Sequence, residues 1–135
     1  MDVIARMPRI LFGDQGRGVF LFLFWGCAAA ILFFSVTPGT VQQSVTGDEG
    51  LLTADQGFYI HSLAYSVLLL LGVLAFQKLF GVSIAVLAYS CFCECLQIFI
   101  PFRKFNPDDM MANGFGILFA LVLFGFVKFL AKEKT

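Results

Sequence analysis

The stretch that decides the fold is residues 82–100, VSIAVLAYSCFCECLQIFI, which contains a single charged side chain, Glu94. A helix of this length rises about 28 Å, close to the ~30 Å thickness of the hydrocarbon core of a bilayer. Three further runs, residues 19–37, 58–76 and 115–131, are similarly long and apolar. None of them alternates between apolar and polar residues as a transmembrane β-strand does. The sequence therefore predicts an all-α fold, an integral membrane bundle of four transmembrane helices.

The composition of the whole chain favours the same class of protein. The 135 residues are 59% hydrophobic and 13% charged, whereas soluble domains average about 25% charged residues. Nine Lys and Arg balance nine Asp and Glu, so there is no basic excess of the kind that nucleic-acid binding requires. The expected partners are the lipid bilayer and a ligand within it, with no nucleic acid. Four helices are also compatible with a homo-oligomer or with a membrane protein partner.

The distribution of cations predicts the orientation of the bundle. Seven Lys and Arg flank the runs on one side and two lie in the loops of the other side, and cytoplasmic segments carry the excess of positive charge. Both termini are therefore expected in the cytoplasm. The expected organisation is a cytoplasmic segment at residues 1–18, a membrane domain at 19–131 and a cytoplasmic tail at 132–135. Residues 1–18 fit either a segment lying on the membrane interface or a disordered tail. The seven cations are Arg6, Arg9, Arg17, Lys78, Lys128, Lys132 and Lys134, and the two are Arg103 and Lys104.

Polar residues gather at the outer ends of the predicted spans. Glu94 is the clearest, since an ionisable side chain within a span costs about 2.5 to 3.5 kcal/mol on insertion scales. Gln97 lies one turn further along the same face, and His61 and Tyr65 share a face of the second span because residues three or four apart are neighbours on a helix. The complete set of candidate site residues is Glu94, His61, Arg103, Asp109, Asn113, Gln97 and Tyr65.

Two interpretations of this set remain open. In the first, it forms an outward-facing pocket in which Arg103 binds an anion, Glu94 and His61 are the candidate acid and base, and the other members complete the ligand-binding shell. In the second, the same groups hydrogen-bond one another and hold the helices in register. Asp108 and Asp109 have a structural alternative of their own, as caps of a helix that begins near Met110.

The cysteines and the small residues have structural interpretations. Cys91, Cys93 and Cys95 lack the spacing of a zinc site, so we expect them to pack among the helices and predict no metal and no cofactor. Gly72 and the pair Gly116 and Ala120 let backbones approach closely, which predicts contact between the second and fourth spans.

Three motifs, read in order, resemble the VanZ-like family of small polytopic membrane proteins. They are HSLAY from His61, ECLQ from Glu94 followed by PFR ending at Arg103, and DMMANGFG from Asp109. SVTP from Ser35 is similar to the motif that closes the first span of that family, and the resemblance covers about residues 30–125. One feature departs from the family pattern, since an Asp-Lys pair is common shortly before the His and this chain has Asp55 followed by Gln56.

The resemblance implies a protein of the bacterial cell envelope, in the plasma or inner membrane. The founding member of the family is associated with low-level resistance to the glycopeptide teicoplanin, a role that does not transfer to every member. Our first hypothesis is an outward-facing site that binds or acts on an anionic, lipid-linked envelope ligand. The alternative is a structural or accessory subunit of a membrane complex, and the sequence leaves open whether the protein is an enzyme. A transporter is less favoured because no charged residue lies in the inner half of any span.

Overall fold

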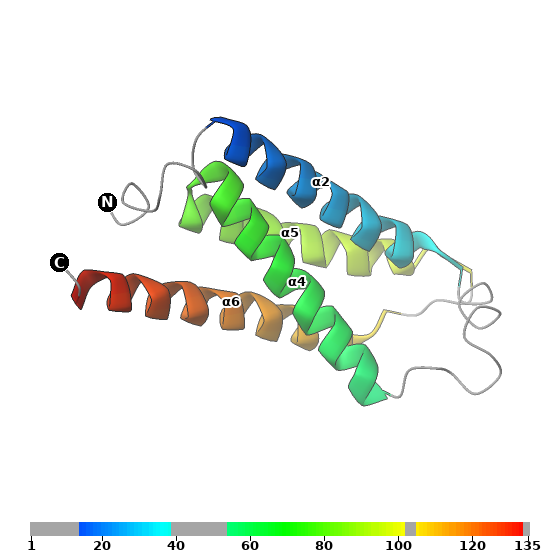
Figure 1. Cartoon of the computed structure of the whole chain (residues 1–135). Helices are drawn as coiled ribbons and strands as arrows, with labels where there is room; N and C mark the ends of the chain where they lie inside the picture. Colours follow the sequence, from blue (N-terminus) through cyan, green and yellow to red (C-terminus); the bar gives the residue numbers. More distant parts are fainter. Residues whose placement is uncertain (1–13, 39–53, 102–104, 134–135) are drawn as a thin grey trace.

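The computed structural model describes residues 14–38, 54–101 and 105–133 and contains four helices and no strand within these ranges (Figure 1). The helices are α2 (Asp14–Val36), α4 (Ala54–Phe76), α5 (Leu79–Gln97) and α6 (Pro107–Glu133). Each of them is long and apolar enough to cross a membrane, which indicates a membrane protein. The prediction of an all-α fold with four long apolar helices is therefore confirmed.

Several helix boundaries differ from those expected. The first helix begins at Asp14, inside the segment 1–18 that was expected to precede the first span, and α5 covers residues 79–97 where the sequence predicted 82–100. The last helix begins at Pro107, eight residues before the apolar run that starts at residue 115. Hydropathy marks the part of a helix that suits lipid, whereas a helix extends into polar sequence until its caps end it.

The start of α6 shows how a cap sets such a boundary. The Asn106 side-chain Oδ1 accepts a hydrogen bond from the backbone N–H of Asp108 at 3.1 Å, which is the contact of an N-cap residue. Pro107 follows at the first helical position, where its missing N–H costs nothing. Asp108 and Asp109 lie in the first turn, where their charge complements the helix dipole. The expectation that either aspartate caps a helix near Met110 is wrong, because Asn106 is the cap.

The turn between α4 and α5 is short and strained. Only Gln77 and Lys78 separate the two helices, and Gln77 adopts φ 56°, a left-handed conformation that favours glycine. Its N–H donates to Val73 O at 2.8 Å, which ends α4 in the usual left-handed manner. From the start of α2, Arg17 Nε donates to Ala75 O at 2.9 Å, so a third helix end is tied to this turn.

Helix α4 is central, since the two most extensive helix contacts, with α6 and with α2, both involve it. The helices alternate in direction, so the start of α2, the α4–α5 turn and the end of α6 lie at one end of the bundle in Figure 1. The opposite end holds the end of α2, the start of α4, the end of α5 and the start of α6. We call it the site end, because His61, Glu94 and Asn113 lie there.

The surface of the bundle is apolar, and the core is narrow. Leu68, Leu69 and Val86 are almost fully buried, whereas Phe22 is 77% exposed and Phe80 is 80% exposed. Large exposed apolar patches are rare on proteins that face water. A surface of this kind suits a lipid environment, in which exposed apolar side chains cost nothing.

Close approach of α4 and α6 depends on Gly116. A Cβ built on Gly116 would overlap the Ser62 carbonyl group, with the carbonyl carbon 2.8 Å away, so only glycine fits this crossing. The predicted contact of the second and fourth spans through Gly116 is confirmed. Gly72 lies elsewhere, because its added Cβ would meet Val82 of α5 and Phe24 of α2. The expectation that Gly72 joins the second and fourth spans is wrong.

Candidate functional site

Glu94 lies in the interior of the bundle at the site end. It is three residues before the last residue of α5, and it is 1% exposed. A carboxylate enclosed in this way costs several kcal/mol unless hydrogen bonds or opposite charges stabilise it. The hydrogen-bond partners of Glu94 are therefore the first contacts to identify at this end of the bundle.

Asn113 of α6 joins Glu94 to His61 of α4. Its Nδ2 donates to Glu94 Oε1 at 3.1 Å, and its Oδ1 is 3.0 Å from His61 Nδ1. Asn113 is 0% exposed, so both ends of its amide are used within the protein. We call these three residues the polar chain. It links three helices through two hydrogen bonds.

The two titratable members of the polar chain do not hydrogen-bond each other directly. His61 Nδ1 lies 3.9 Å from Glu94 Oε1, which is beyond hydrogen-bond length. From the sequence, His61 and Glu94 were the candidate acid and base. In the structure the Asn113 amide lies between them. The His61 side chain is 30% exposed whereas that of Glu94 is 1% exposed. The imidazole is therefore the member of the chain that a ligand can reach.

Serine hydroxyls hold α4 and α6 in the register that forms the polar chain. Ser62 Oγ donates to Ala112 O at 2.9 Å, directly beside His61 and Asn113. One turn further, Ser66 Oγ lies 2.7 Å from Gly116 O and 2.7 Å from Ser62 O. Small polar residues stabilise helix contacts in this way when the backbones are close. Neither serine is among the residues predicted for the site, although their spacing of four residues beside His61 places them on the same helix face.

A second set of buried polar groups lies beside the polar chain. Tyr65 is 2% exposed and lies against Cys93 and Ser90 of α5, with the charge of Glu94 nearby. Cys93 is 0% exposed and also contacts Tyr89 and Ser35. Cys93 thus packs among the helices, as expected, although its neighbours are polar. Cys95 is exposed, so the expectation that it packs among the helices is wrong. From α5, Tyr89 Oη donates to Ala28 O of α2 at 2.5 Å, so this set ties α2 to the rest of the bundle.

The remaining candidate residues divide into three cases. Gln97 is 2% exposed and lies one turn from Glu94 on α5. Asp109 is half-buried in the first turn of α6, and among the described residues no hydrogen bond or ion pair joins it to the polar chain. Arg103 lies outside the described residues. Its predicted role as the anion-binding group stays a prediction.

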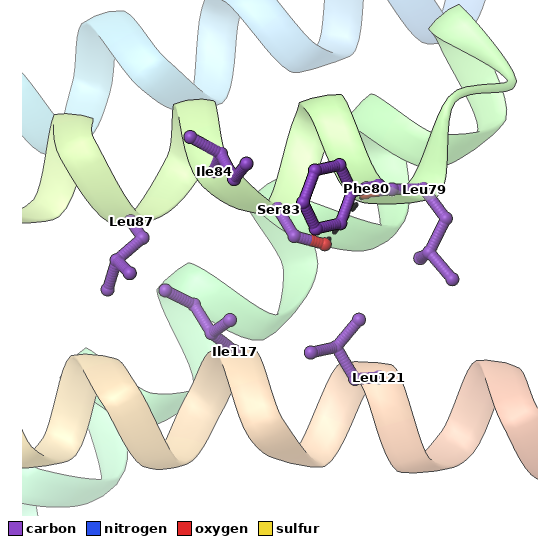
Figure 2. Close-up of a pocket in the computed structure, with 7 residues that line it drawn as sticks. All are labelled: Leu79, Phe80, Ser83, Ile84, Leu87, Ile117 and Leu121. Carbon is purple, nitrogen blue, oxygen red and sulfur yellow. Dashed lines mark hydrogen bonds between the residues drawn. The ribbon is translucent and has the colours of Figure 1, made fainter.

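An apolar groove of about 420 Å³ lies between α5 and α6, below the polar chain. Figure 2 shows Ile117 and Leu121 of α6 directed toward α5 across it. Its polar lining residue, Ser83, donates its hydroxyl to Leu79 O at 2.8 Å. Ile117 follows Asn113 by one helical turn, so the groove begins just beneath the polar chain. The lining residues are Leu79, Phe80, Ser83, Ile84, Leu87, Ile117 and Leu121.

Comparisons with models of protein families, with curated proteins and with solved structures found no match to this chain. The resemblance to the VanZ-like family therefore rests on the order and spacing of the motifs. Within those motifs, His61, Glu94 and Asn113 come from three separate helices and meet at one place. The arrangement can keep a carboxylate inside the bundle and hold an imidazole in a defined orientation at its edge.

Proposed function

We propose that this chain is a VanZ-like protein of the bacterial plasma or inner membrane whose outward-facing polar site binds an anionic, lipid-linked envelope ligand. Both termini lie in the cytoplasm in this proposal, as the excess of cations at that end of the bundle favours. The site end then faces the outer surface, where precursors of the envelope are assembled. The observation that carries the proposal is the polar chain, with a buried carboxylate at one end and an accessible imidazole at the other.

Arg103 supplies the charge that selects an anion in this proposal. In the sequence it lies between Gln97, the last residue of α5, and Pro107, the first residue of α6. A guanidinium binds phosphate or carboxylate through two parallel hydrogen bonds, which are about twice as strong as neutral ones. Gln97, Tyr65 and Asp109 complete the ligand-binding shell in this proposal. If chemistry follows binding, His61 is the acid or base within reach of the ligand, and Glu94 acts on it through Asn113.

The apolar groove supports a ligand that carries a lipid chain. It opens between α5 and α6 on the surface that faces lipid, and its lining is almost entirely aliphatic or aromatic. Leu79, at its far end, precedes Glu94 by 15 positions, or about 22 Å along the helix. A headgroup at the site end and a long chain in the groove fit this geometry.

Two variants test the proposed function by native mass spectrometry of the purified protein with anionic lipids. Arg103→Ala removes the anion-binding charge, and His61→Phe keeps a ring of similar size without its nitrogens. We expect Arg103→Ala to bind phosphatidylglycerol about tenfold more weakly or worse while keeping the melting temperature of the parent, and His61→Phe to bind it about fivefold more weakly. His61→Phe also leaves the buried Asn113 Oδ1 without a donor, so its melting temperature is expected to fall. Lys78→Ala is the matched control, since it removes an exposed cation at the opposite end of the bundle. Parent-like binding by both variants contradicts the proposal.

A structural or accessory role is the second candidate, and one observation favours it. The hydrogen bonds of the polar chain and of the serines join α6 to α4 and to α5, which is what a purely structural cluster would do. In that case the parent binds no anionic lipid, and loss of the polar chain lowers the stability of the protein or detaches a partner subunit. Co-purification from native membranes with the parent and with Asn113→Leu separates the two candidates.

A further inference from the structure

We propose that His61 is held in the neutral Nδ1–H tautomer and presents Nε2 as a hydrogen-bond acceptor, so that the site recognises a hydroxyl group on the headgroup of its anionic lipid. The inference rests on the proposed function for the ligand, and on the polar chain alone for the tautomer. Asn113 is then a positioning residue, because it acts through the imidazole.

The orientation of the Asn113 amide follows from Glu94. Asn113 Nδ2 donates to Glu94 Oε1 at 3.1 Å, so the NH₂ group of the amide faces the Glu94 carboxyl group. The carbonyl Oδ1 therefore faces His61 Nδ1 at 3.0 Å. A carbonyl oxygen can only accept, so Nδ1 carries the proton and donates it. The carboxylate thus determines the tautomer of a ring that it does not touch.

The second ring nitrogen is available to a ligand. In a neutral imidazole with its proton on Nδ1, Nε2 has a lone pair and accepts. Among the described residues, no hydrogen bond to Nε2 is formed, and Nε2 is not an enclosed atom. The side chain is 30% exposed. An accessible acceptor recognises a donor, and a hydroxyl is the uncharged donor that headgroups of anionic lipids commonly carry.

The tautomer is measurable directly because the chain contains one histidine. Protein labelled with ¹⁵N-histidine and freed of any histidine tag gives one pair of ring-nitrogen signals in detergent micelles at neutral pH. We expect a protonated, pyrrole-type Nδ1 and an unprotonated, pyridine-type Nε2. In Asn113→Leu, which keeps the bulk of the side chain, we expect the proton to move to Nε2, the tautomer that histidine favours in water. Ser66→Ala, which weakens the same helix contact away from the ring, keeps the parent tautomer.

Two lipids of equal charge test the recognition of a hydroxyl. Phosphatidylglycerol and phosphatidylmethanol are both phosphodiesters with one negative charge, and only the first carries headgroup hydroxyls. We expect the parent to bind phosphatidylglycerol about fivefold more tightly, the worth of one neutral hydrogen bond. Asn113→Leu loses this preference and keeps its affinity for phosphatidylmethanol.

The outcomes separate this inference from the proposed function. An Nε2–H tautomer or a doubly protonated ring in the parent overturns the inference, whatever lipid is bound. The expected tautomer with equal affinity for the two lipids overturns the recognition of a hydroxyl and leaves anionic-lipid binding standing. The expected tautomer without binding of either lipid overturns the proposed function and the ligand class together, and it leaves only the orientation of His61.

Discussion

Replacing Gly116 by alanine is the sharpest test of the helix packing that forms the polar chain. The added methyl group would overlap the Ser62 carbonyl, which is backbone and cannot rotate away. Helices α4 and α6 must therefore move apart. This movement weakens the bonds from Ser62 to Ala112 O and from Ser66 to Gly116 O.

The cost follows from these contacts. Overpacking of a tight contact costs about 1 to 3 kcal/mol, and each interhelical hydrogen bond in a membrane protein is worth about 0.6 kcal/mol. We expect Gly116→Ala to lower the free energy of unfolding by about 2 to 4 kcal/mol. Because Asn113 lies one turn away on the same helix, the Nδ1–H tautomer of His61 is expected to be lost as well.

Gly114→Ala is the matched control on the same helix. A Cβ at Gly114 meets nothing within 4 Å, and alanine stabilises a helix by up to about 1 kcal/mol relative to glycine. Unfolding by titration with a denaturing detergent, followed by circular dichroism, compares the two variants with the parent. Equal stability of Gly116→Ala and Gly114→Ala would refute the close crossing of α4 and α6 and, with it, the register that forms the polar chain.

Three further predictions concern single positions. Gln77→Gly relieves the left-handed strain at φ 56° and is expected to stabilise the protein by about 1 kcal/mol, seen as a higher melting temperature, and a lower one would argue against this turn. Asn106→Ala removes the N-cap of α6 and is expected to cost about 1 kcal/mol, whereas Asn106→Asp retains the cap and most of the stability in the same melting assay. Glu94→Gln keeps an acceptor for Asn113 Nδ2 and is expected to fold like the parent, whereas Glu94→Leu leaves that buried donor without an acceptor and costs about 1 to 3 kcal/mol. Equal detergent-unfolding midpoints for the two Glu94 variants would show that the Asn113 bond contributes nothing.

The residues of the candidate site were easier to find in the sequence than their contacts. Glu94 and His61 stand out because ionisable groups are rare in apolar helices, and Asn113 belongs to a motif at the start of the last helix. The order of contact was not predictable, since an amide inserted between an imidazole and a carboxylate depends on how three helices are rotated. Ser62 and Ser66 were overlooked because a serine in an apolar helix often bonds only to its own backbone. Their importance comes from the α6 carbonyls opposite them.

The amino-acid sequence by itself determined the four helices and their apolar character. Length and hydropathy are local properties of each segment, and an apolar segment long enough to cross a bilayer must form a helix to satisfy its own backbone hydrogen bonds. The sequence also determined that the unusual polar residues gather at one end, because consecutive helices joined in series reverse direction. Only the tertiary structure decided which residues touch. Gly116 meets α4, whereas Gly72 meets Phe24 and Val82. The rotation and offset of each helix are set by the steric fit of residues far apart in the chain, and that fit brings Asn113 between His61 and Glu94.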